Sequence, residues 1–349
     1  MGDILAYKYM KLSECSNGEI LSENLYDLEG SILVSKNSTI NPYIAERLEE
    51  YKVDKVPVYI SKEELSGRQK RDFRGLYKES VITLKSIMNN LAIGKIVAPK
   101  KIREISDTLY AYIDKVGISI EHIFEIKAKD KYTYNHSMNV ALYALLIGEW
   151  LGCSEEEKKN IIKAGLLHDI GKSRIPLEIL NKKGKLTKEE FDIVKTHTII
   201  GYKMSKDILS IDENVRQAIL SHHERVDGSG YPQGLKGDEI NSYAKILAIA
   251  DVYDALISKR VYKEKSTPFE AVEELKRIGA YSFDVNILKV FFDNIVNYYL
   301  GSKVKISDGH IGEIVFIPPN NITCPVVKLG NTYVDLAKEE ELKILEMVG

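Results

Sequence analysis

This chain of 349 residues contains few cysteines and a single tryptophan, and neither positive nor negative charge is in large excess. The three cysteines lie far apart without a CxxC pair, which argues against a disulfide framework or a zinc knuckle and suits a reducing compartment. The 49 Lys and Arg residues nearly balance the 51 Asp and Glu residues, leaving a net charge of −2. This composition disfavours binding to a nucleic-acid polymer or an anionic membrane, but it allows a local basic pocket for a small anion.

Long apolar runs are also absent. The first residues lack the apolar core and the small-residue cleavage site that are typical of a signal peptide. The longest apolar stretch, residues 140–151, is too short and too interrupted to span a bilayer. These absences predict a cytoplasmic protein without membrane insertion. The 44% of hydrophobic and 29% of charged residues are typical of a soluble globular protein, and the length predicts about two domains.

The pattern of apolar residues predicts a mainly α fold with a small β-rich unit at each end. Residues 1–62 are expected to form a β-rich module with one capped helix, whose role, regulatory or otherwise, the sequence leaves open. Residues 63–96 are predicted to be a linker and a helix. Residues 97–300 carry apolar positions spaced by three and four, as a helical domain does. Residues 301–349 carry hairpin signals and are predicted to be a small β-rich appendage.

A capping box marks the start of one helix in the central domain. Ser154 is followed three residues later by a glutamate, which predicts a helix over residues 155–167. His168 and Asp169 then lie near the carboxyl end of this helix. Gly171 is expected to end it in a left-handed conformation.

The distribution of histidine points to chemistry. Five of the seven histidines fall within residues 136–223, which also contain one His-Asp pair and one His-His pair. These five are His136, His168, His197, His222 and His223. His197 follows a second capping box, at Thr187, and is expected almost three turns along that helix. Histidines clustered with acidic residues are typical of metal sites, and five unrelated helix histidines are the alternative.

Two aspartates lie on an otherwise apolar helical segment, AKILAIADVYDALI. A buried carboxylate on such a helix is costly unless it is paired or binds a metal. Asp251 has apolar neighbours on both sides and is the stronger ligand candidate. Asp254, one turn later, is expected to hold a ligating histidine by its other ring nitrogen. Together these residues would supply ligands for two ions, with Asp169 as the bridge.

Several of these segments resemble a known family. Residues 168–172, HDIGK, resemble the signature of the HD phosphohydrolases, and residues 222–232, HHERVDGSGYP, resemble the second signature of the HD-GYP subfamily. The runs that end at His136 and at His197, and the ADVYDAL segment, also fit. The resemblance covers residues 97–299, and the order of its motifs makes it specific.

The resemblance implies an all-α HD-GYP catalytic domain that binds a small cyclic dinucleotide at a centre of two or three metals. One ion would take His136, His168, Asp169 and Asp251, and the other would take Asp169, His197, His222 and His223. The trinuclear variant of the family has a glutamate where this chain has Tyr132, so two divalent ions are expected. Iron or manganese is favoured, since a site of histidines and carboxylates without thiolates suits either.

The implied reaction is hydrolysis of cyclic di-GMP to linear pGpG, and further cleavage to GMP stays open. Two ions about 4 Å apart would lower the pKa of a bridging water, and the resulting hydroxide would attack phosphorus. Besides Asp169, the catalytic candidate is Lys172, which would neutralise charge on the transferring phosphate. The alternative for Lys172 is a cation that meets the dipole of a helix carboxyl end.

Further positions match residues of the family that bind substrate. Tyr231 would stack on or bond to the nucleotide, and Gly228 and Gly230 would let their loop approach it closely. Arg260 and Lys263 match positions that bind the second phosphate. The alternatives are a loop-packing aromatic for Tyr231 and two solvated surface charges for the basic pair.

Other functions remain open at this stage. The substrate could be 3',3'-cyclic GMP-AMP or a linear dinucleotide, because nothing in the sequence separates these from cyclic di-GMP. A non-catalytic sensor or adaptor for cyclic dinucleotides is the alternative from another class, and its expected sign is the loss of ligand residues, none of which is lost. Docking to a diguanylate cyclase (GGDEF) protein and formation of a homodimer are also left open.

Overall fold

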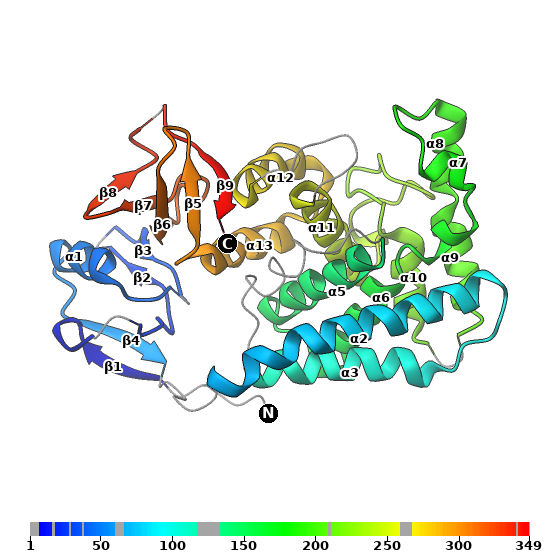
Figure 1. Cartoon of the computed structure of the whole chain (residues 1–349), viewed down its shortest axis with the longest axis horizontal. Helices are drawn as coiled ribbons and strands as arrows, with labels where there is room; N and C mark the ends of the chain where they lie inside the picture. The colour runs from blue at the N-terminus through cyan, green and yellow to red at the C-terminus, as the bar shows by residue number, and fades with distance from the viewer. Residues whose placement is uncertain are drawn as a thin grey trace. The chain divides into compact units, whose positions relative to one another are not determined.

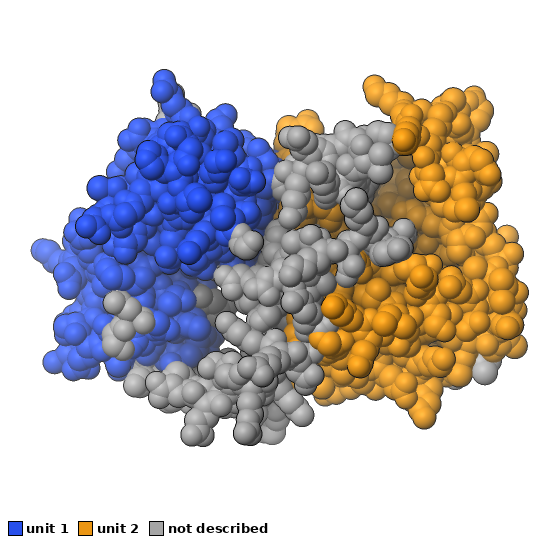
Figure 2. All heavy atoms as spheres, viewed as in Figure 1, with its two compact units in different colours: residues 1–67, 267–273, 292–349 blue, residues 68–266, 274–291 orange. Residues whose placement is uncertain are grey.

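The structure is a computed structural model, and it describes residues 7–15, 18–27, 29–36, 38–59, 66–116, 133–208, 211–258, 267–339 and 341–348. These residues fold into two compact units, coloured separately in Figure 2. One unit comprises residues 1–67, 267–273 and 292–349, and the other comprises residues 68–266 and 274–291. Within the described ranges, no helix is long and apolar enough to cross a membrane.

The N-terminal part of the first unit contains short strands and one helix. Its elements are β1 (Tyr7–Lys11), η1 (Leu12–Glu14), β2 (Leu25–Tyr26), β3 (Ile32–Val34), α1 (Pro42–Glu50) and β4 (Lys55–Tyr59). The strands form two separate antiparallel pairs, β1 with β4 and β2 with β3, so this β structure is smaller than expected. Asn41 caps α1 by accepting the backbone N–H of Ile44, and Pro42 occupies the first helical position, so α1 is the capped helix expected within residues 1–62.

The C-terminal part of the first unit is the predicted small β-rich structure. Its strands are β5 (Lys303–Ile306), β6 (Ile311–Phe316), β7 (Val326–Leu329), β8 (Thr332–Asp335) and β9 (Ile344–Val348). They form one antiparallel sheet in the order β8-β7-β6-β5-β9. Val315, Phe316 and Val326 of this sheet share a hydrophobic core with N-terminal residues such as Leu48 and Val56. The two ends of the chain therefore stabilise one another within a single unit.

The other secondary-structure elements of the described chain are all helices, so the mainly α character is confirmed (Figure 1). The first group is α2 (Ser66–Ala92), α3 (Pro99–Val116), α5 (Thr133–Trp150), α6 (Glu155–Leu167), η2 (Ile170–Arg174), α7 (Leu177–Leu180) and α8 (Lys188–Lys195). The second group is α9 (His197–Ser205), α10 (Glu213–Ser221), η3 (Gly237–Glu239), α11 (Ser242–Ile257), α12 (Pro268–Ser282), α13 (Val285–Ile295) and η4 (Val296–Tyr299). The helix predicted over residues 155–167 has those bounds, and both capping boxes are present.

Two apolar helices, α5 and α11, form the centre of the helical unit. Every residue from 137 to 148 of α5 is buried, as expected for a helix that is apolar all round. Tyr143 of α5 packs edge-on against Tyr253 of α11, with ring centroids 5.2 Å apart. This packing brings the first turn of α5, with His136, close to Asp251 in the second half of α11.

Candidate metal centre

All of the predicted ligand side chains come together in the helical unit, although they are spread over more than a hundred residues of sequence. His136 comes from α5, and Asp251 comes from α11. The remaining ones lie at helix ends: His168 caps α6, Asp169 precedes η2, His197 begins α9, and His222 and His223 follow α10. Side chains at helix ends can converge on one point, whereas successive side chains inside a helix point in directions about 100° apart.

The expectation that His197 lies within the helix that follows Thr187 is wrong. That helix, α8, ends at Lys195, Thr196 is its C-cap, and His197 is the first residue of α9. The break between the two helices was not visible in the sequence, which contains neither glycine nor proline at this point. It allows the His197 side chain to leave the direction of α8 and to face Asp169.

The expected left-handed conformation of Gly171 is also wrong, because Gly171 is not among the residues with positive φ. Its lack of a side chain serves close packing instead. A Cβ atom at this position would overlap the carbonyl oxygen of His197 and lie 2.7 Å from the backbone nitrogen of Gly201. Only glycine therefore lets η2 lie this close to α9, which brings Asp169 beside His197.

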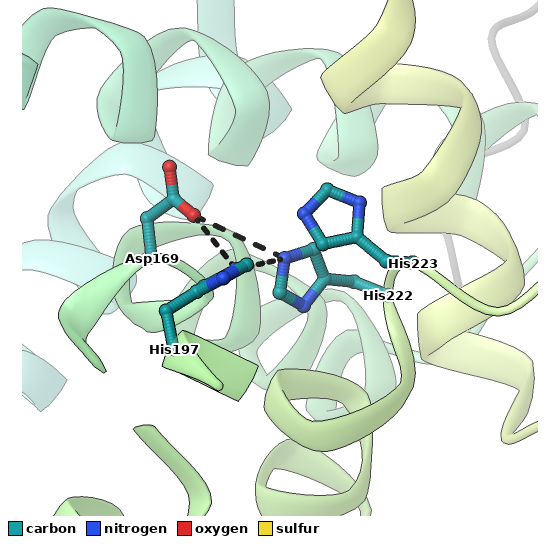
Figure 3. Close-up of side chains that lie close together, drawn as sticks. All are labelled: Asp169, His197, His222 and His223. Atoms are coloured by element: carbon teal, nitrogen blue, oxygen red, sulfur yellow. Dashed lines mark hydrogen bonds and ion pairs between the residues drawn. The ribbon is translucent and has the colours of Figure 1, made fainter. Parts of the chain in front are cut away.

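One cluster consists of Asp169, His197, His222 and His223 (Figure 3). Each residue offers one ligand atom, and these atoms all lie within 4.8 Å of one another. The Nε2 atoms of His197 and His222 lie 3.4 and 4.0 Å from Oδ1 of Asp169. The same two Nε2 atoms are 3.4 Å apart. Three imidazoles thus surround one carboxylate oxygen.

A second cluster consists of His136, His168 and Asp251. Nε2 of His136 lies 3.1 Å from Oδ1 of Asp251. Oδ2 of Asp169 also faces this cluster, at 3.7 Å from Nε2 of His136 and 3.4 Å from Nε2 of His168. Asp169 therefore presents one oxygen to each cluster, which is the arrangement of a carboxylate that bridges two ions.

Hydrogen bonds to Nδ1 orient the histidines. His168, His197 and His222 each use Nδ1 to contact the carbonyl oxygen three residues earlier, at 2.8, 2.7 and 2.9 Å. His136 instead contacts Oδ2 of Asp254 at 2.7 Å, which confirms the predicted role of Asp254 in holding a histidine. Such contacts leave Nε2 directed into the cluster and raise its basicity.

Within the described part of the chain, two buried atoms of the clusters have no hydrogen-bond partner, namely Nε2 of His168 and Oδ1 of Asp169. Leaving a buried polar atom unsatisfied costs about 1–3 kcal/mol, so such atoms are rare in folded proteins. Oδ1 of Asp169 faces the first cluster and Nε2 of His168 belongs to the second, so a cation at each cluster would satisfy both atoms. The donor set of imidazoles and carboxylates, with these two atoms at its centre, therefore fits a divalent metal-binding site.

Comparison with known proteins agrees with this geometry. Residues 121–287 match the HD domain family. The chain therefore carries an HD domain. It is 31% identical over 244 residues to cyclic di-GMP phosphodiesterase PA4108 of Pseudomonas aeruginosa, covering 70% of this chain and 59% of that protein. It is 36% identical over 234 residues to a cyclic di-GMP phosphodiesterase of Thermotoga maritima, covering 67% of this chain and 59% of that protein.

This chain therefore spans less than two thirds of the length of either relative. Among solved structures, Bd1817, an HDG"Y"P protein from Bdellovibrio bacteriovorus, has a similar fold with a TM-score of 0.54. The match covers 83% of this chain and 99% of that chain at 16% sequence identity, so it shows likeness of fold alone.

Histidines of the two clusters of the HD domain have pKa values shifted in opposite directions. Burial disfavours the charged form of His136, but hydrogen bonds and charges from Asp251 and Asp254 outweigh it and raise its pKa to about 10. Burial lowers the pKa of His223 to about 3, and its more distant contact with Asp251 does not compensate. Burial likewise lowers the pKa values of His197 and His222.

The carboxylates of the site are held in their ionised form. Burial would raise the pKa of Asp169, but the ammonium group of Lys172 and the contact with His168 hold it well below its usual value. Nζ of Lys172 lies 2.5 Å from Oδ2 of Asp169. The pKa of Asp251 is also held well below its usual value, because its contact with His136 outweighs burial. Ionised carboxylates are the form that binds cations.

The glycine-rich loop of the HD domain lies directly against the clusters. The ring of Tyr231 stacks on that of His223, with centroids 4.7 Å apart and planes inclined at 31°. A Cβ atom at Gly230 would overlap the backbone of Glu224 and Arg225, so glycine is needed for the loop to fold back on itself. Gly228 has a φ of +83°, which also favours glycine.

Arg260, Lys263 and Tyr132 lie outside the described residues. Conversely, Glu224 was not singled out in the sequence, yet it is buried and accepts the backbone N–H groups of Gln233 and Leu235, which anchors the loop. Its position inside the HHERVDGSGYP run was the only available signal.

Proposed function

We propose that this HD domain is a metal-dependent phosphodiesterase that hydrolyses cyclic di-GMP to linear pGpG. The observation that carries the proposal is the position of Asp169, which offers one carboxylate oxygen to each of two adjacent His/Asp clusters. Both of the curated relatives described above are named cyclic di-GMP phosphodiesterases, which supports the substrate class. Hydrolysis onward to GMP is left to the product assay.

Two divalent ions, iron or manganese, belong to the proposal. One would be held by His136, His168, Asp169 and Asp251, and the other by Asp169, His197, His222 and His223. When bound, such ions supply a hydroxide nucleophile near neutral pH and neutralise charge on the phosphate. The seven side chains provide imidazole and carboxylate donors without thiolates, which suits iron or manganese.

The chain's own residues would orient the phosphate and balance its charge. The side chain of Lys172 is partly exposed and contacts Asp169, so its ammonium group lies where it can pair with a phosphate oxygen at the centre. Tyr231, which covers His223, would contact the nucleotide attached to that phosphate. Gly228 and Gly230 would shape the loop that presents Tyr231. Arg260 and Lys263 would bind the second phosphate.

Two alternatives are kept for the same site. The mixed 3',3'-cyclic GMP-AMP has the same phosphodiester bonds, so the metal centre alone does not discriminate against it. A non-catalytic sensor would be expected to lack one or more ligands, and the presence of all seven side chains favours catalysis. The three widely spaced cysteines suit a reducing compartment and so support a cytoplasmic location. The proposed ligand there is the free cyclic dinucleotide.

A product assay tests the proposal. The protein is purified without air, loaded with Fe(II) or Mn(II), and given cyclic di-GMP and 3',3'-cyclic GMP-AMP side by side, with products separated by chromatography. Asp169→Asn should lower turnover by more than about a thousandfold, because both ions lose a shared ligand. Asp207→Asn, an exposed aspartate outside the clusters, is the matched control and should retain full turnover.

Metal content decides how the result is interpreted. Turnover by the loaded Asp169→Asn protein at the wild-type rate would contradict the bridging role. A loaded wild-type protein that binds either dinucleotide without cleaving it would establish the sensor instead.

A further inference from the structure

Helix α8 places an exposed aromatic residue and a lysine beside the metal centre. Phe191 is 44% exposed, although it is one of the largest apolar side chains. Its ring lies 6.4 Å from that of Tyr231 in an edge-on arrangement, with planes at 79°. Nζ of Lys195 lies 4.8 Å from the ring of Phe191 and 5.9 Å from the ring of Tyr231, so one cation contacts both rings.

These contacts continue inward to the candidate ligands. Tyr231 stacks on His223 at 4.7 Å and lies edge-on to His197 at 6.4 Å. Exposure of the side chains increases outward, from 0% at His197 and 17% at His223 to 34% at Lys195. Phe191 is the outermost member, on a helix at the edge of the unit (Figure 1). A row of rings thus leads from the metal centre to solvent.

The metal centre and the row of rings fit the two parts of a nucleotide, namely its phosphate and its purine base. A phosphate at the clusters leaves the attached purine to extend outward along the row, and a purine has a flat π face that stacks on aromatic side chains. Phe191 keeps 44% of its surface exposed while its ring contacts Tyr231 and Lys195, so part of the ring stays open to a ligand. Nζ of Lys195 also lies 2.8 Å from Oδ1 of Asp192, whose side chain is 53% exposed.

We propose that Phe191 forms a purine-binding subsite next to Tyr231, with Lys195 as a positioning residue that keeps the two rings at a fixed spacing. This inference rests on the proposed function, because it assumes a nucleotide phosphate at the metal centre. The ligand class is a purine nucleotide.

Steady-state kinetics of the metal-loaded protein with cyclic di-GMP test the subsite. Phe191→Ala should raise KM about tenfold, the loss expected for one base–aromatic stack, and change kcat less than about twofold. The matched control is Ile193→Ala, because Ile193 is 41% exposed on the same helix but points about 200° away. Inhibition by inorganic phosphate, which has no base, should be the same in both variants. An unchanged KM in Phe191→Ala, or an equal loss of phosphate inhibition, would overturn the subsite.

Lys195 is tested by rescue. Lys195→Met should raise KM without loss of bound metal, and Lys195→Arg should restore it, because a guanidinium also packs on aromatic faces. If Lys195→Arg behaves like Lys195→Met while metal content and phosphate inhibition stay normal, the positioning role of Lys195 is wrong.

A binding measurement separates the subsite from catalysis. Phe191→Trp adds a fluorophore to a chain with one native tryptophan, and GMP should quench its emission in the metal-loaded protein, whereas ribose 5-phosphate should not. Quenching by GMP in a protein that hydrolyses neither dinucleotide would support the subsite and contradict the proposed phosphodiesterase. Turnover of cyclic di-GMP without quenching would do the reverse.

Discussion

The two ligand clusters are built from the same residue types, yet the pKa values of His223 and His136 are shifted in opposite directions. In one, His223 shares a buried space with two further imidazoles, and burial lowers its pKa to about 3. In the other, His136 lies between Asp251 and Asp254, which raise its pKa to about 10. The difference arises from the number of carboxylates around each imidazole. It shows that a list of ligands does not predict how readily each half of the centre accepts a cation.

The largest expected effect is on the pH dependence of metal binding. A ligating histidine must be unprotonated, so an ion entering the His136 cluster displaces a proton at any pH below about 10. Affinity at this cluster should therefore fall about tenfold for each pH unit below that value. The cluster with His223 should show no such dependence above about pH 6, since the pKa values of its histidines are lowered.

Mn(II) titration by calorimetry in buffers of different ionisation enthalpy measures both quantities. Between pH 9 and pH 6, the affinity for one ion should fall about a thousandfold, and its binding should release one proton. The affinity for the other ion should stay constant. If the affinities for the two ions change with pH by the same slope, the predicted difference between the clusters is wrong.

A smaller effect is expected from Asp254→Asn. The variant loses the carboxylate that orients His136 through Nδ1, and loss of such a contact typically costs 10–100-fold in metal affinity. This loss should be seen near pH 9, where proton competition is weakest. At the same time the pKa of His136 should fall, so the weakening on acidification should begin at lower pH.

Metal content at several pH values, measured for Asp254→Asn and for Asp207→Asn as the control, separates these two effects. If Asp254→Asn reduces occupancy of both ions alike, Asp254 supports the whole fold rather than one cluster.

The smallest effect, on stability, should come from Gly171→Ala. The added Cβ would overlap the carbonyl oxygen of His197 and force η2 away from α9, at a cost of about 1–3 kcal/mol. The His197 cluster should lose its ion before the His136 cluster does, because the displacement separates Asp169 from His197. Gly75→Ala is the control, since its Cβ would meet no atom within 4 Å inside α2, and it should be neutral or slightly stabilising.

Denaturant unfolding and metal content provide the measurements for this pair. Equal unfolding midpoints for Gly171→Ala and Gly75→Ala would show that the close approach of η2 and α9 is not required.

Local features were predictable because they depend on neighbours in sequence. The capping box at Ser154 was confirmed together with the bounds of α6, since an N-cap side chain bonds to a backbone N–H only three residues away. The capped helix expected within residues 1–62 is α1, whose N-cap is Asn41. The contact of Asp254 with a histidine was also predictable, because a buried carboxylate on an apolar helix requires a partner.

Features that depend on packing between helices were not predictable. His197 was expected inside α8, and only the packed structure shows the break that turns it toward Asp169. The role of Gly171 was misjudged for the same reason, because its constraint comes from a carbonyl 26 positions later in the chain. Phe191 and Lys195 carried no signal of their own, and their meeting with Tyr231 depends on how α8 lies against the glycine-rich loop.

The sequence by itself determined which donor atoms the chain can offer, namely histidines and aspartates without thiolates, and where some of its helices begin, α6 and α8 among them. Residue chemistry and hydrogen bonds between near neighbours suffice for both. Only the tertiary structure decided how those donors divide into two clusters around the two oxygens of Asp169. It also decided why the pKa of His136 is raised while that of His223 is lowered. Distances between side chains from different helices set these properties, and such distances arise only when the helices pack.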